Sequence, residues 1–213
     1  MTTSDVIAGQ QALTKAPPPG SVTFEEFLEW LDEDIHAEWV DGAVIMMSPA
    51  SDQHQDLIEF LLTVLRLFNE AHQAGWVRIA PFIMRTDARP SGREPDILFV
   101  AKERTHLVQT NFLDGPADLI VEIISPESIG RDRGDKFVEY EAAGVREYWL
   151  IDPLRQQAEF YELSADGLYR PGAIGSDGVY RSLVLKGFWL RVEWLWQTPL
   201  PPVLSVLKEL GVL

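Results

Sequence analysis

The sequence predicts an α/β (α+β) fold in which a mixed β-sheet is flanked by helices and carries added β-hairpins. From residue 51 onward, the patterns predict a helix, three strands, a helix and a strand in that order. Residues 119–124 are apolar except for Glu122, which is typical of a central strand buried on both faces. After Pro153, short apolar segments alternate with glycine turns, and this pattern indicates hairpins.

Composition indicates one folded unit. With 213 residues, of which 46% are hydrophobic, the chain can bury a sizeable core. We expect residues 1–20, which are small, polar and proline-rich, to form a flexible N-terminal tail, and residues 21–213 to form a single domain. No apolar run reaches the roughly 18 residues of a membrane span, and the first residues lack a basic region followed by an apolar one. We therefore expect a cytoplasmic protein with no membrane partner.

Charge and cysteine content exclude several classes of site. The chain contains no cysteine, which excludes disulfides, thiolate zinc sites and a cysteine nucleophile. A net charge of −15 argues against a broad phosphate-binding surface. Residues 78–146, however, hold 10 of the 18 basic residues and 12 of the 33 acidic ones. This nearly neutral segment repels a polyanion least.

The first third of the chain shows clear start and turn signals. Thr23 and Glu26 form a capping box that predicts a helix over residues 23–34. The dipeptide Asp41-Gly42 predicts a tight hairpin turn between two strands. A long helix is expected to start at Ser51 or Asp52 and to stop at Gly75. His54 lies in its first turn, where a surface or capping role is more common than a catalytic one.

The middle of the chain is predicted as a meander followed by a buried strand. Residues 76–84 indicate a strand, residues 86–94 an exposed turn and residues 95–100 the next strand. Residues 101–118 are expected to be a connection with one helical turn. The buried strand then covers residues 119–125 and ends before Pro126.

The last part alternates between helix and strand. A helix is predicted over residues 132–143, with Gly144 as its left-handed stop. A strand follows over residues 145–152. Hairpin strands are expected within residues 157–196, and residues 204–210 form a short C-terminal helix.

Two carboxylates occupy unusual positions within these elements. Asp96 opens one predicted strand, and Glu122 interrupts the buried strand. An ionised Glu in such a strand costs several kcal/mol unless a cation meets it. The partner could be Lys136, or Asp96 with a shared metal ion, or both. Asp132, Lys136 and Tyr140 are spaced by four residues and therefore project along one helix face.

The known sequence motifs narrow the chemistry. The chain has no GxGxxG loop, no phosphate-binding loop of the GxxxxGK type and no GxSxG nucleophile elbow. Two neighbouring carboxylates can bind a hard cation such as Mg²⁺, which makes hydroxide from water and offsets charge on a phosphate. A nearby lysine such as Lys136 can orient that water or stabilise the developing charge. Asp96, Glu122 and Lys136 therefore suit phosphodiester hydrolysis.

The same residues lie in a pattern that resembles a known group of nucleases. Five segments carry the resemblance: EWVDGAVIMMSP with the following His54, EPDILFV, DLIVEIISPES, RDRGDKFVEY and AGVREYWLIDP. In this order they resemble the PD-(D/E)XK nuclease superfamily and, more closely, the Uma family of restriction-endonuclease-like proteins. The resemblance covers residues 21 to about 155 well and the rest loosely.

The resemblance implies a restriction-endonuclease-like core and a metal-dependent DNA endonuclease. It implies that Asp96 and Glu122 bind Mg²⁺ (or Mn²⁺) and that duplex DNA is the partner. Ile124 stands where the superfamily has its lysine, and Lys136 on the next helix would take that role. Glu38 also matches the family pattern, as a third acidic catalytic residue or as an anchor of the hairpin. Asp96, Glu122, Lys136 and Glu38 are thus the candidate catalytic residues.

Two other functions compete with the favoured endonuclease. One is a catalytically inactive relative that acts as a DNA- or protein-interaction module, in which the pair of Glu122 and Lys136 is structural. The other is a metal-dependent hydrolase of a smaller phosphate compound, which the acidic surface would tolerate better. The tryptophan-rich C-terminal part and the two strands of duplex DNA further suggest a homodimer.

Overall fold

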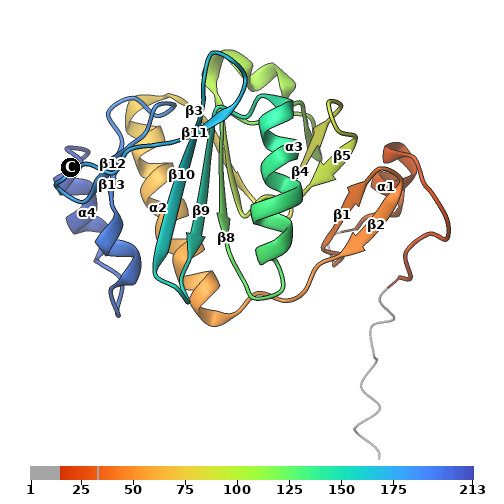
Figure 1. The fold of residues 1–213 in the computed structure, drawn as a ribbon, viewed down its shortest axis with the longest axis horizontal. Coiled ribbons are helices and arrows are strands. Elements are labelled where there is room, and N and C mark those ends of the chain that lie inside the picture. Colours follow the sequence, from red (N-terminus) through yellow and green to blue (C-terminus); the bar gives the residue numbers. More distant parts are fainter. Residues whose placement is uncertain (1–14, 33) are drawn as a thin grey trace, which may run out of the picture.

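The computed structural model describes residues 15–32 and 34–213 and contains two mixed β-sheets (Figure 1). The larger sheet has six strands in the order β11-β10-β9-β8-β6-β3, and the smaller has five in the order β2-β1-β5-β4-β7. Helix α2 packs on one face of the six-stranded sheet and α3 on the other. The predicted class, a mixed sheet flanked by helices with added hairpins, is confirmed.

The elements have the following bounds. The α-helices are α1 (Phe24–Trp30), α2 (Asp52–His72), α3 (Lys136–Ala143) and α4 (Val203–Glu209). Two 3-10 helices cover Lys102–Leu107 and Val192–Trp196, and a π-helical turn covers Arg131–Asp135. The strands are β1 (Ala37–Val40), β2 (Ala43–Met46), β3 (Gly75–Ile79), β4 (Ile83–Thr86), β5 (Ser91–Arg93), β6 (Ile97–Ala101), β7 (Phe112–Asp114), β8 (Leu119–Ile123), β9 (Glu147–Asp152), β10 (Gln157–Leu163), β11 (Tyr169–Pro171), β12 (Val179–Arg181) and β13 (Trp189–Arg191).

The N-terminal helix and hairpin follow their sequence signals. The Thr23 side chain accepts a hydrogen bond from the Glu26 amide, and the Glu26 carboxylate accepts one from the Thr23 amide. Helix α1 ends at Trp30 and not at residue 34, because Leu31 adopts an extended conformation. Asp41 and Gly42 have φ values of 46° and 86°, which confirms the predicted turn between β1 and β2.

The predicted end of the long helix is wrong by two residues. Ser51 caps α2 through the His54 amide, as expected, but the left-handed residue that ends the helix is Gln73. Gly75 instead begins β3, where an added Cβ would lie 2.0 Å from the Val100 carbonyl oxygen. Gly75 is therefore needed for the close approach of β3 to β6 and not as a helix stop.

The predicted meander is only partly correct. Strands β3 and β6 do pair antiparallel, but residues 76–84 are not one strand. The run breaks at Ala80-Pro81, and its second half becomes β4 in the other sheet. The predicted exposed turn contains β5, whose three residues are buried and pair with β1 and β4. Strand β7 was likewise predicted as part of a connection.

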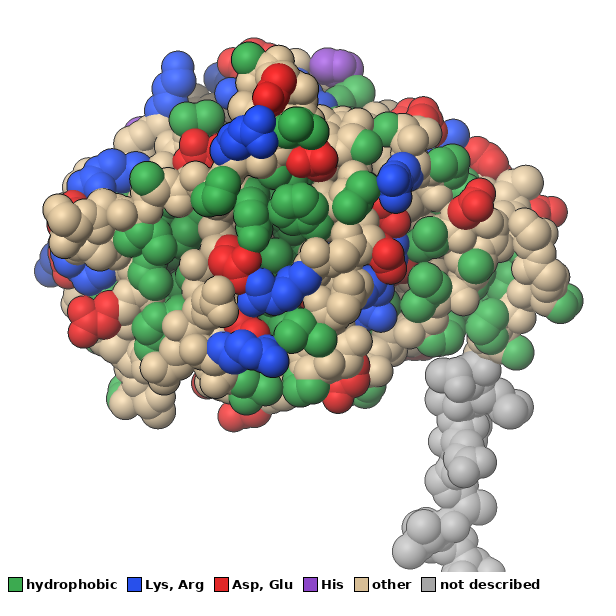
Figure 2. Space-filling view, in the orientation of Figure 1, with side chains coloured by type: hydrophobic (Ala, Val, Ile, Leu, Met, Phe, Trp, Pro, Cys, Tyr) green, Lys and Arg blue, Asp and Glu red, His purple; other side chains and the backbone are tan. Residues whose placement is uncertain are grey.

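The predicted core of the sheet is confirmed. All five residues of β8 are buried, and β8 lies between β6 and β9. Gly144 ends α3 with a φ of 88°, and α4 and strands β10 to β13 form where expected. Two predictions are only partly correct: Val192–Trp196 is a 3-10 helix and not a strand, and the predicted helix over residues 132–143 begins as the π-helical turn Arg131–Asp135. Figure 2 shows apolar side chains gathered on the face that carries β10, β11 and α3, where Phe137, Tyr161 and Leu163 pack against the core.

A buried carboxylate joins β9 to the C-terminal hairpin. Glu147 is fully buried, yet no lysine or arginine among the described residues pairs with it. Its carboxylate accepts five hydrogen bonds, from the Trp149 indole, the Tyr180 and Ser182 hydroxyls, and the amides of residues 183 and 184. Burial raises the pKa of Glu147, and these donors oppose the shift.

The predicted division into a tail and a single domain remains a prediction. Residues 1–14 of the expected tail lie outside the described part of the chain. Near its end, the Lys15 ammonium donates to the Trp30 carbonyl, and the Trp30 indole donates to the Ala16 carbonyl. No helix in residues 15–32 and 34–213 has the length and apolar character needed to cross a membrane.

Candidate functional site

Asp96 and Glu122 lie side by side at the ends of two adjacent strands. Asp96 directly precedes β6, and the pairing of Ile97 with Val121 places it level with Glu122 on β8. Directly opposite residues share one face of an antiparallel pair. Asp96 Oδ2 also accepts a hydrogen bond of 2.7 Å from the Ile123 amide. The structure therefore brings the two predicted metal ligands together.

Lys136 reaches this position from the start of α3. Its buried Nζ lies 2.8 Å from Glu122 Oε1, 3.1 Å from Glu38 Oε1 and 3.5 Å from Asp132 Oδ1. Burial alone would lower the pKa of Lys136, but the three carboxylates outweigh it and hold that pKa well above its usual value. Ile124 meanwhile belongs to the apolar core under α3. Lys136 from α3, and not Ile124, thus lies beside Glu122.

Glu38 connects β1 to the same cluster. Both of its oxygens are engaged: Oε1 faces Lys136, and Oε2 lies 2.7 Å from Arg93 Nη1. Its carboxylate also accepts the Glu94 amide at 3.3 Å. Although burial would raise its pKa, Lys136 and Arg93 lower it, so Glu38 is held ionised. All four candidate residues are therefore in one cluster, and Glu38 holds the cations in place.

Arg93 is a site residue that the sequence did not reveal. Its guanidinium makes a bidentate pair with Glu139, with Nε to Oε2 at 2.7 Å and Nη2 to Oε1 at 2.6 Å. Burial would lower the pKa of Arg93, but Glu139 and Glu38 raise it instead. Arg93 sits in a polar run that resembles a loop, so its burial leaves no periodic signal. Glu139 could have been suspected, because it lies three residues after Lys136 on the same helix.

His54 belongs to the segments that carry the family resemblance, but the surface or capping role expected for it is not what the structure shows. Its Nε2 lies 3.2 Å from Asp96 Oδ2, and only 13% of its side chain is exposed. Burial would lower the pKa of His54, but Asp96 outweighs it and raises that pKa. The ring nitrogen Nδ1 is buried without a hydrogen-bond partner among the described residues. His54 therefore orients Asp96 from the first turn of α2.

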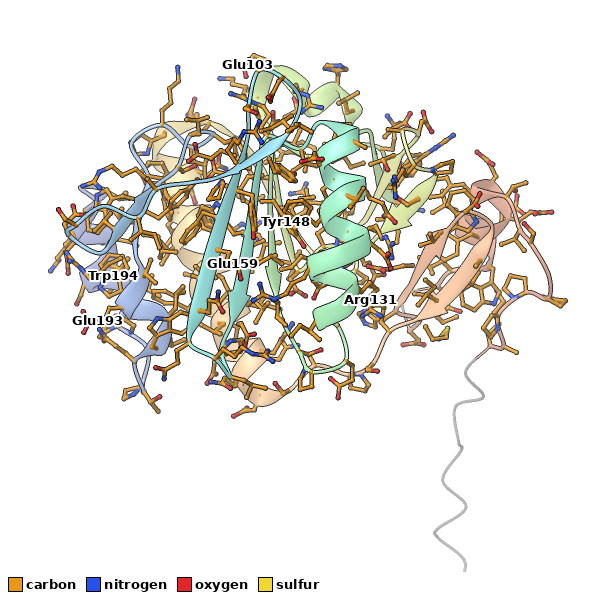
Figure 3. All side chains as sticks on the ribbon, in the orientation of Figure 1. Glu103, Arg131, Tyr148, Glu159, Glu193 and Trp194 are labelled. Atoms are coloured by element: carbon orange, nitrogen blue, oxygen red, sulfur yellow. The ribbon has the colours of Figure 1, made fainter. Side chains whose placement is uncertain are left out.

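The helical side of the cluster is fixed by two tyrosines. Tyr140 Oη donates to Glu122 Oε1 at 3.0 Å. Tyr148 on β9, labelled in Figure 3, donates to the Asp132 carbonyl at 3.0 Å and so holds the π-helical turn that begins at Arg131. Both phenols are fully buried, and burial raises the pKa of each. They therefore remain protonated donors.

The cluster holds more carboxylates than cations. Four of its six carboxylates pair with the permanently charged cations Arg93 and Lys136, and the other two lie beside histidines, with His54 3.2 Å from Asp96 and His36 3.4 Å from Glu94. The six carboxylates are Glu38, Glu94, Asp96, Glu122, Asp132 and Glu139. Burial raises the pKa of Glu122, and Asp132 and Asp96 add to the shift while Lys136 opposes it. A further cation would offset the repulsion between Glu122 and these two neighbouring carboxylates.

Comparison with known proteins agrees with this architecture. The Uma2 family profile, described as "Putative restriction endonuclease", matches residues 24–193. The chain belongs to the Uma2 family. The crystal structure of "a putative nuclease belonging to DUF820 from Anabaena variabilis ATCC 29413" is similar, with a TM-score of 0.69 and 17% identity over 82% of this chain and 97% of that chain. That likeness shows a shared fold. No curated protein matches the sequence.

The Uma2 match confirms the resemblance seen in the sequence and extends it. The five motif segments end near residue 155, whereas the family match continues to residue 193 and includes β10 to β13. The C-terminal hairpins are therefore part of the Uma2 region of this chain.

The Uma2 site offers a divalent metal two carboxylates. Among the described residues, no group of three or more His, Cys, Asp or Glu side chains is arranged to hold a metal ion. Mg²⁺ is commonly bound through one or two carboxylates and keeps several water ligands. Asp96 and Glu122 fit this mode of binding.

Glu94 gives the Uma2 cluster a pH-dependent stability. Burial, followed by the charge of Glu38, raises the pKa of Glu94 from 4.5 to about 8. Between these values the folded state binds more protons than the unfolded state, so the free energy of unfolding falls as the pH rises. Glu94→Gln is neutral at every pH and should not lose this stability. The free energy of unfolding of the variant minus that of the wild type is therefore expected to be about 2 kcal/mol larger at pH 8.5 than at pH 5.

Urea unfolding of both proteins at the two pH values measures this difference. Glu103→Gln, at an exposed position on the 3-10 helix after β6, is the matched control and should follow the wild type. If the free energies of unfolding of Glu94→Gln and wild type differ by the same amount at pH 5 and at pH 8.5, the pKa of Glu94 is not raised in the folded protein.

Proposed function

We propose that this Uma2 protein is a DNA endonuclease that hydrolyses phosphodiester bonds with Mg²⁺ or Mn²⁺. The observation that carries the proposal is the pairing of Asp96 and Glu122 on adjacent strands, inside a buried cluster that has more carboxylates than cations. The family and the fold support nuclease chemistry.

The residues around the metal position would have distinct roles. Asp96 and Glu122 would hold the ion, which when bound supplies an activated water and offsets charge on the phosphate. Asp96 is held by the Ile123 amide and His54, and Glu122 by Lys136 and Tyr140. These contacts fix both carboxylates before any ligand arrives.

Lys136 would act as a cation and not as a base. Its pKa is held well above the usual value, so it keeps its proton at neutral pH. A protonated amine cannot take a proton from water, but it can stabilise negative charge that develops on the phosphate. Glu38 and Asp132, at 3.1 Å and 3.5 Å from Lys136 Nζ, would keep the ammonium group in position if Glu122 held a metal ion.

Calorimetric titration with Mn²⁺ tests the metal site directly. We expect the wild type to bind Mn²⁺ and Asp96→Asn to bind it at least about tenfold more weakly, since even outer-shell partners of metal sites are worth that much. Asp87→Asn, the same substitution in the exposed turn after β4, should bind like the wild type.

Cleavage of duplex DNA completes the test. Product formation in Mg²⁺ or Mn²⁺ that stops in EDTA supports the proposal. The inactive interaction module makes the opposite prediction, because an ion pair that only stabilises the fold has no need of metal. Absence of both Mn²⁺ binding and metal-dependent cleavage in the folded protein would reject the endonuclease in favour of that alternative.

The homodimer also remains a proposal. Light scattering of the purified protein measures it directly, and a monomeric mass at micromolar concentration would dismiss it.

A further inference from the structure

A tryptophan and an arginine form an exposed pair on an edge strand near the candidate site. Strand β3 is the last strand of the six-stranded sheet, so no strand in the described part of the chain pairs with its outer side. Trp76 on β3 is 41% exposed, which is unusual for the largest apolar side chain. The guanidinium carbon of Arg78 lies 4.4 Å from the centroid of the Trp76 ring. The pair is thus a preformed surface with an aromatic face and a positive charge.

A second arginine adds to the positive charge of this edge. Arg66 lies on α2, which packs along β3 (Figure 1). Asn69, three residues after Arg66 on α2, donates to the Gly75 carbonyl at the start of β3, which places Arg66 beside this strand. Burial, followed by the positive charge of Arg66, lowers the pKa of Arg78. Within residues 15–32 and 34–213, neither arginine takes part in an ion pair, and the Arg78 guanidinium donates only to the Val77 carbonyl, at 3.0 Å.

Two neighbouring unpaired arginines are unexpected in this protein. The chain has a net charge of −15, and most of its other arginines are paired with carboxylates. Like charges held close together repel each other, and an anion between them would remove the repulsion. The arginine pair is therefore suited to an anionic ligand that comes from outside the chain.

The register of the sheet connects this edge to the candidate site. Trp76 is opposite Val100 and Arg78 is opposite Leu98, so both side chains start on the face that carries Asp96. The Ala80 amide, just beyond β3, donates to the Asp96 carbonyl. Since a strand rises about 3.4 Å per residue, Arg78 is about 7 Å and Trp76 about 14 Å along β3 from the level of Asp96. One nucleic-acid strand can extend over such distances.

We propose that Trp76, Arg78 and Arg66 bind an unpaired nucleotide of the strand whose phosphate lies at Asp96 and Glu122. The base stacks on the exposed face of Trp76, and the phosphates on either side of it bind the two arginines. Aromatic rings next to cationic side chains are the common means of holding single strands without sequence preference. The identity of the bound strand rests on the proposed endonuclease function.

Self-association through this edge is the competing use of the surface. An exposed strand edge with Trp76 and Ile79 could pair with a second copy of itself. Such pairing would bring Arg66 and Arg78 of one copy close to those of the other, which adds repulsion. Charge complementarity therefore favours the nucleic acid.

Binding of fluorescent oligonucleotides in EDTA tests the proposal without requiring metal or hydrolysis. We expect Trp76→Ala to weaken binding of single-stranded oligo-dT about tenfold, with little change for blunt duplex, and Trp76→Phe to restore most of the affinity. For the double variant Arg66→Gln/Arg78→Gln, the slope of log K against log salt should become less negative by about 1.4, which is about 0.7 for each lost phosphate contact.

Arg191→Gln is the matched control for the arginine variants. Arg191 also lies over a tryptophan, with 5.7 Å to the Trp189 ring centroid, but it is paired with Glu209 in the C-terminal part. This control should keep the wild-type affinity and salt dependence. Thermal unfolding of every variant verifies that it is folded.

The outcomes separate this proposal from the proposed function. Weaker single-strand binding by folded Trp76→Ala supports the nucleotide site even if no DNA is cleaved, in which case only the endonuclease fails. Unchanged affinity and salt dependence in all variants would overturn the nucleotide site even if the wild type cleaves DNA. A shift in oligomeric mass of Trp76→Ala, without a change in DNA affinity, would overturn it in favour of self-association.

Discussion

Glu122→Gln is expected to slow metal-dependent DNA cleavage by about 10³-fold and to leave the protein folded. The variant removes one of the two carboxylates proposed to hold the metal, together with the charge stabilisation that depends on it. The fold survives because Lys136 keeps Glu38 at 3.1 Å and Asp132 at 3.5 Å, and the new amide oxygen can still accept from Tyr140. We therefore expect this variant to lose cleavage activity and to keep its stability.

Single-turnover cleavage with excess enzyme, measured beside urea unfolding, checks this expectation. Glu103→Gln, at the exposed position labelled in Figure 3, is the matched substitution and should cleave at the wild-type rate. Lys136→Met provides the contrast. It removes the only ammonium group among the described residues that touches Glu122, so we expect it to lose both cleavage and stability. Undiminished cleavage by pure Glu122→Gln would show that the carboxylate pair is not the catalytic centre.

Arg93→Met is expected to lower the free energy of unfolding by about 3–5 kcal/mol. Its guanidinium is the shared partner of two buried carboxylates, Glu38 on β1 and Glu139 on α3. Removing one partner of a buried pair leaves an unmatched charge in a low-dielectric interior, and the cost is of this size. Methionine keeps much of the apolar stem, so the loss reports on charge and not on a cavity.

Urea denaturation at pH 7 measures the change. Arg170→Met is the control, because Arg170 pairs with Asp166 at the surface, where such pairs contribute less than about 1 kcal/mol. Adding Glu139→Gln to Arg93→Met should recover part of the loss, since it removes one unmatched charge. If Arg93→Met costs no more than Arg170→Met, the buried cluster is not paired in solution as the structure describes.

The fold was most predictable where the sequence is periodic or carries a capping signal. The capping box at Thr23, the apolar stripe of α2 and the apolar run of β8 each identify an element without tertiary information. The three-residue strands β5 and β7 have no such pattern, because a strand of three residues is too short to show alternation. Strand β5 also depends on pairing with β1, and β7 depends on pairing with β4, and both of these partners lie far away in the sequence.

The residues of the candidate site also differ in how well the sequence predicts them. Asp96 and Glu122 stand out because carboxylates rarely occur beside or within buried strands, and Lys136 follows from its helical spacing. Arg93 and His54 do not stand out, because arginine in a polar run and histidine in a first helical turn are ordinary surface residues. Arg93 is buried because β5 packs against β1, and His54 is buried because α2 packs against the sheet.

The hydrogen bonds of Glu147 limit where the chain can be cut into fragments that fold independently. Two of its five donors are side chains at residues 180 and 182, and two more are the amides of residues 183 and 184, all after β11. A fragment cut before β12 would leave this carboxylate in the central sheet with only one of its donors, the Trp149 indole. The stretch that carries Asp96, Glu122 and Lys136 is therefore expected to fold and to melt together with the C-terminal hairpin, and a minimal active fragment must retain both.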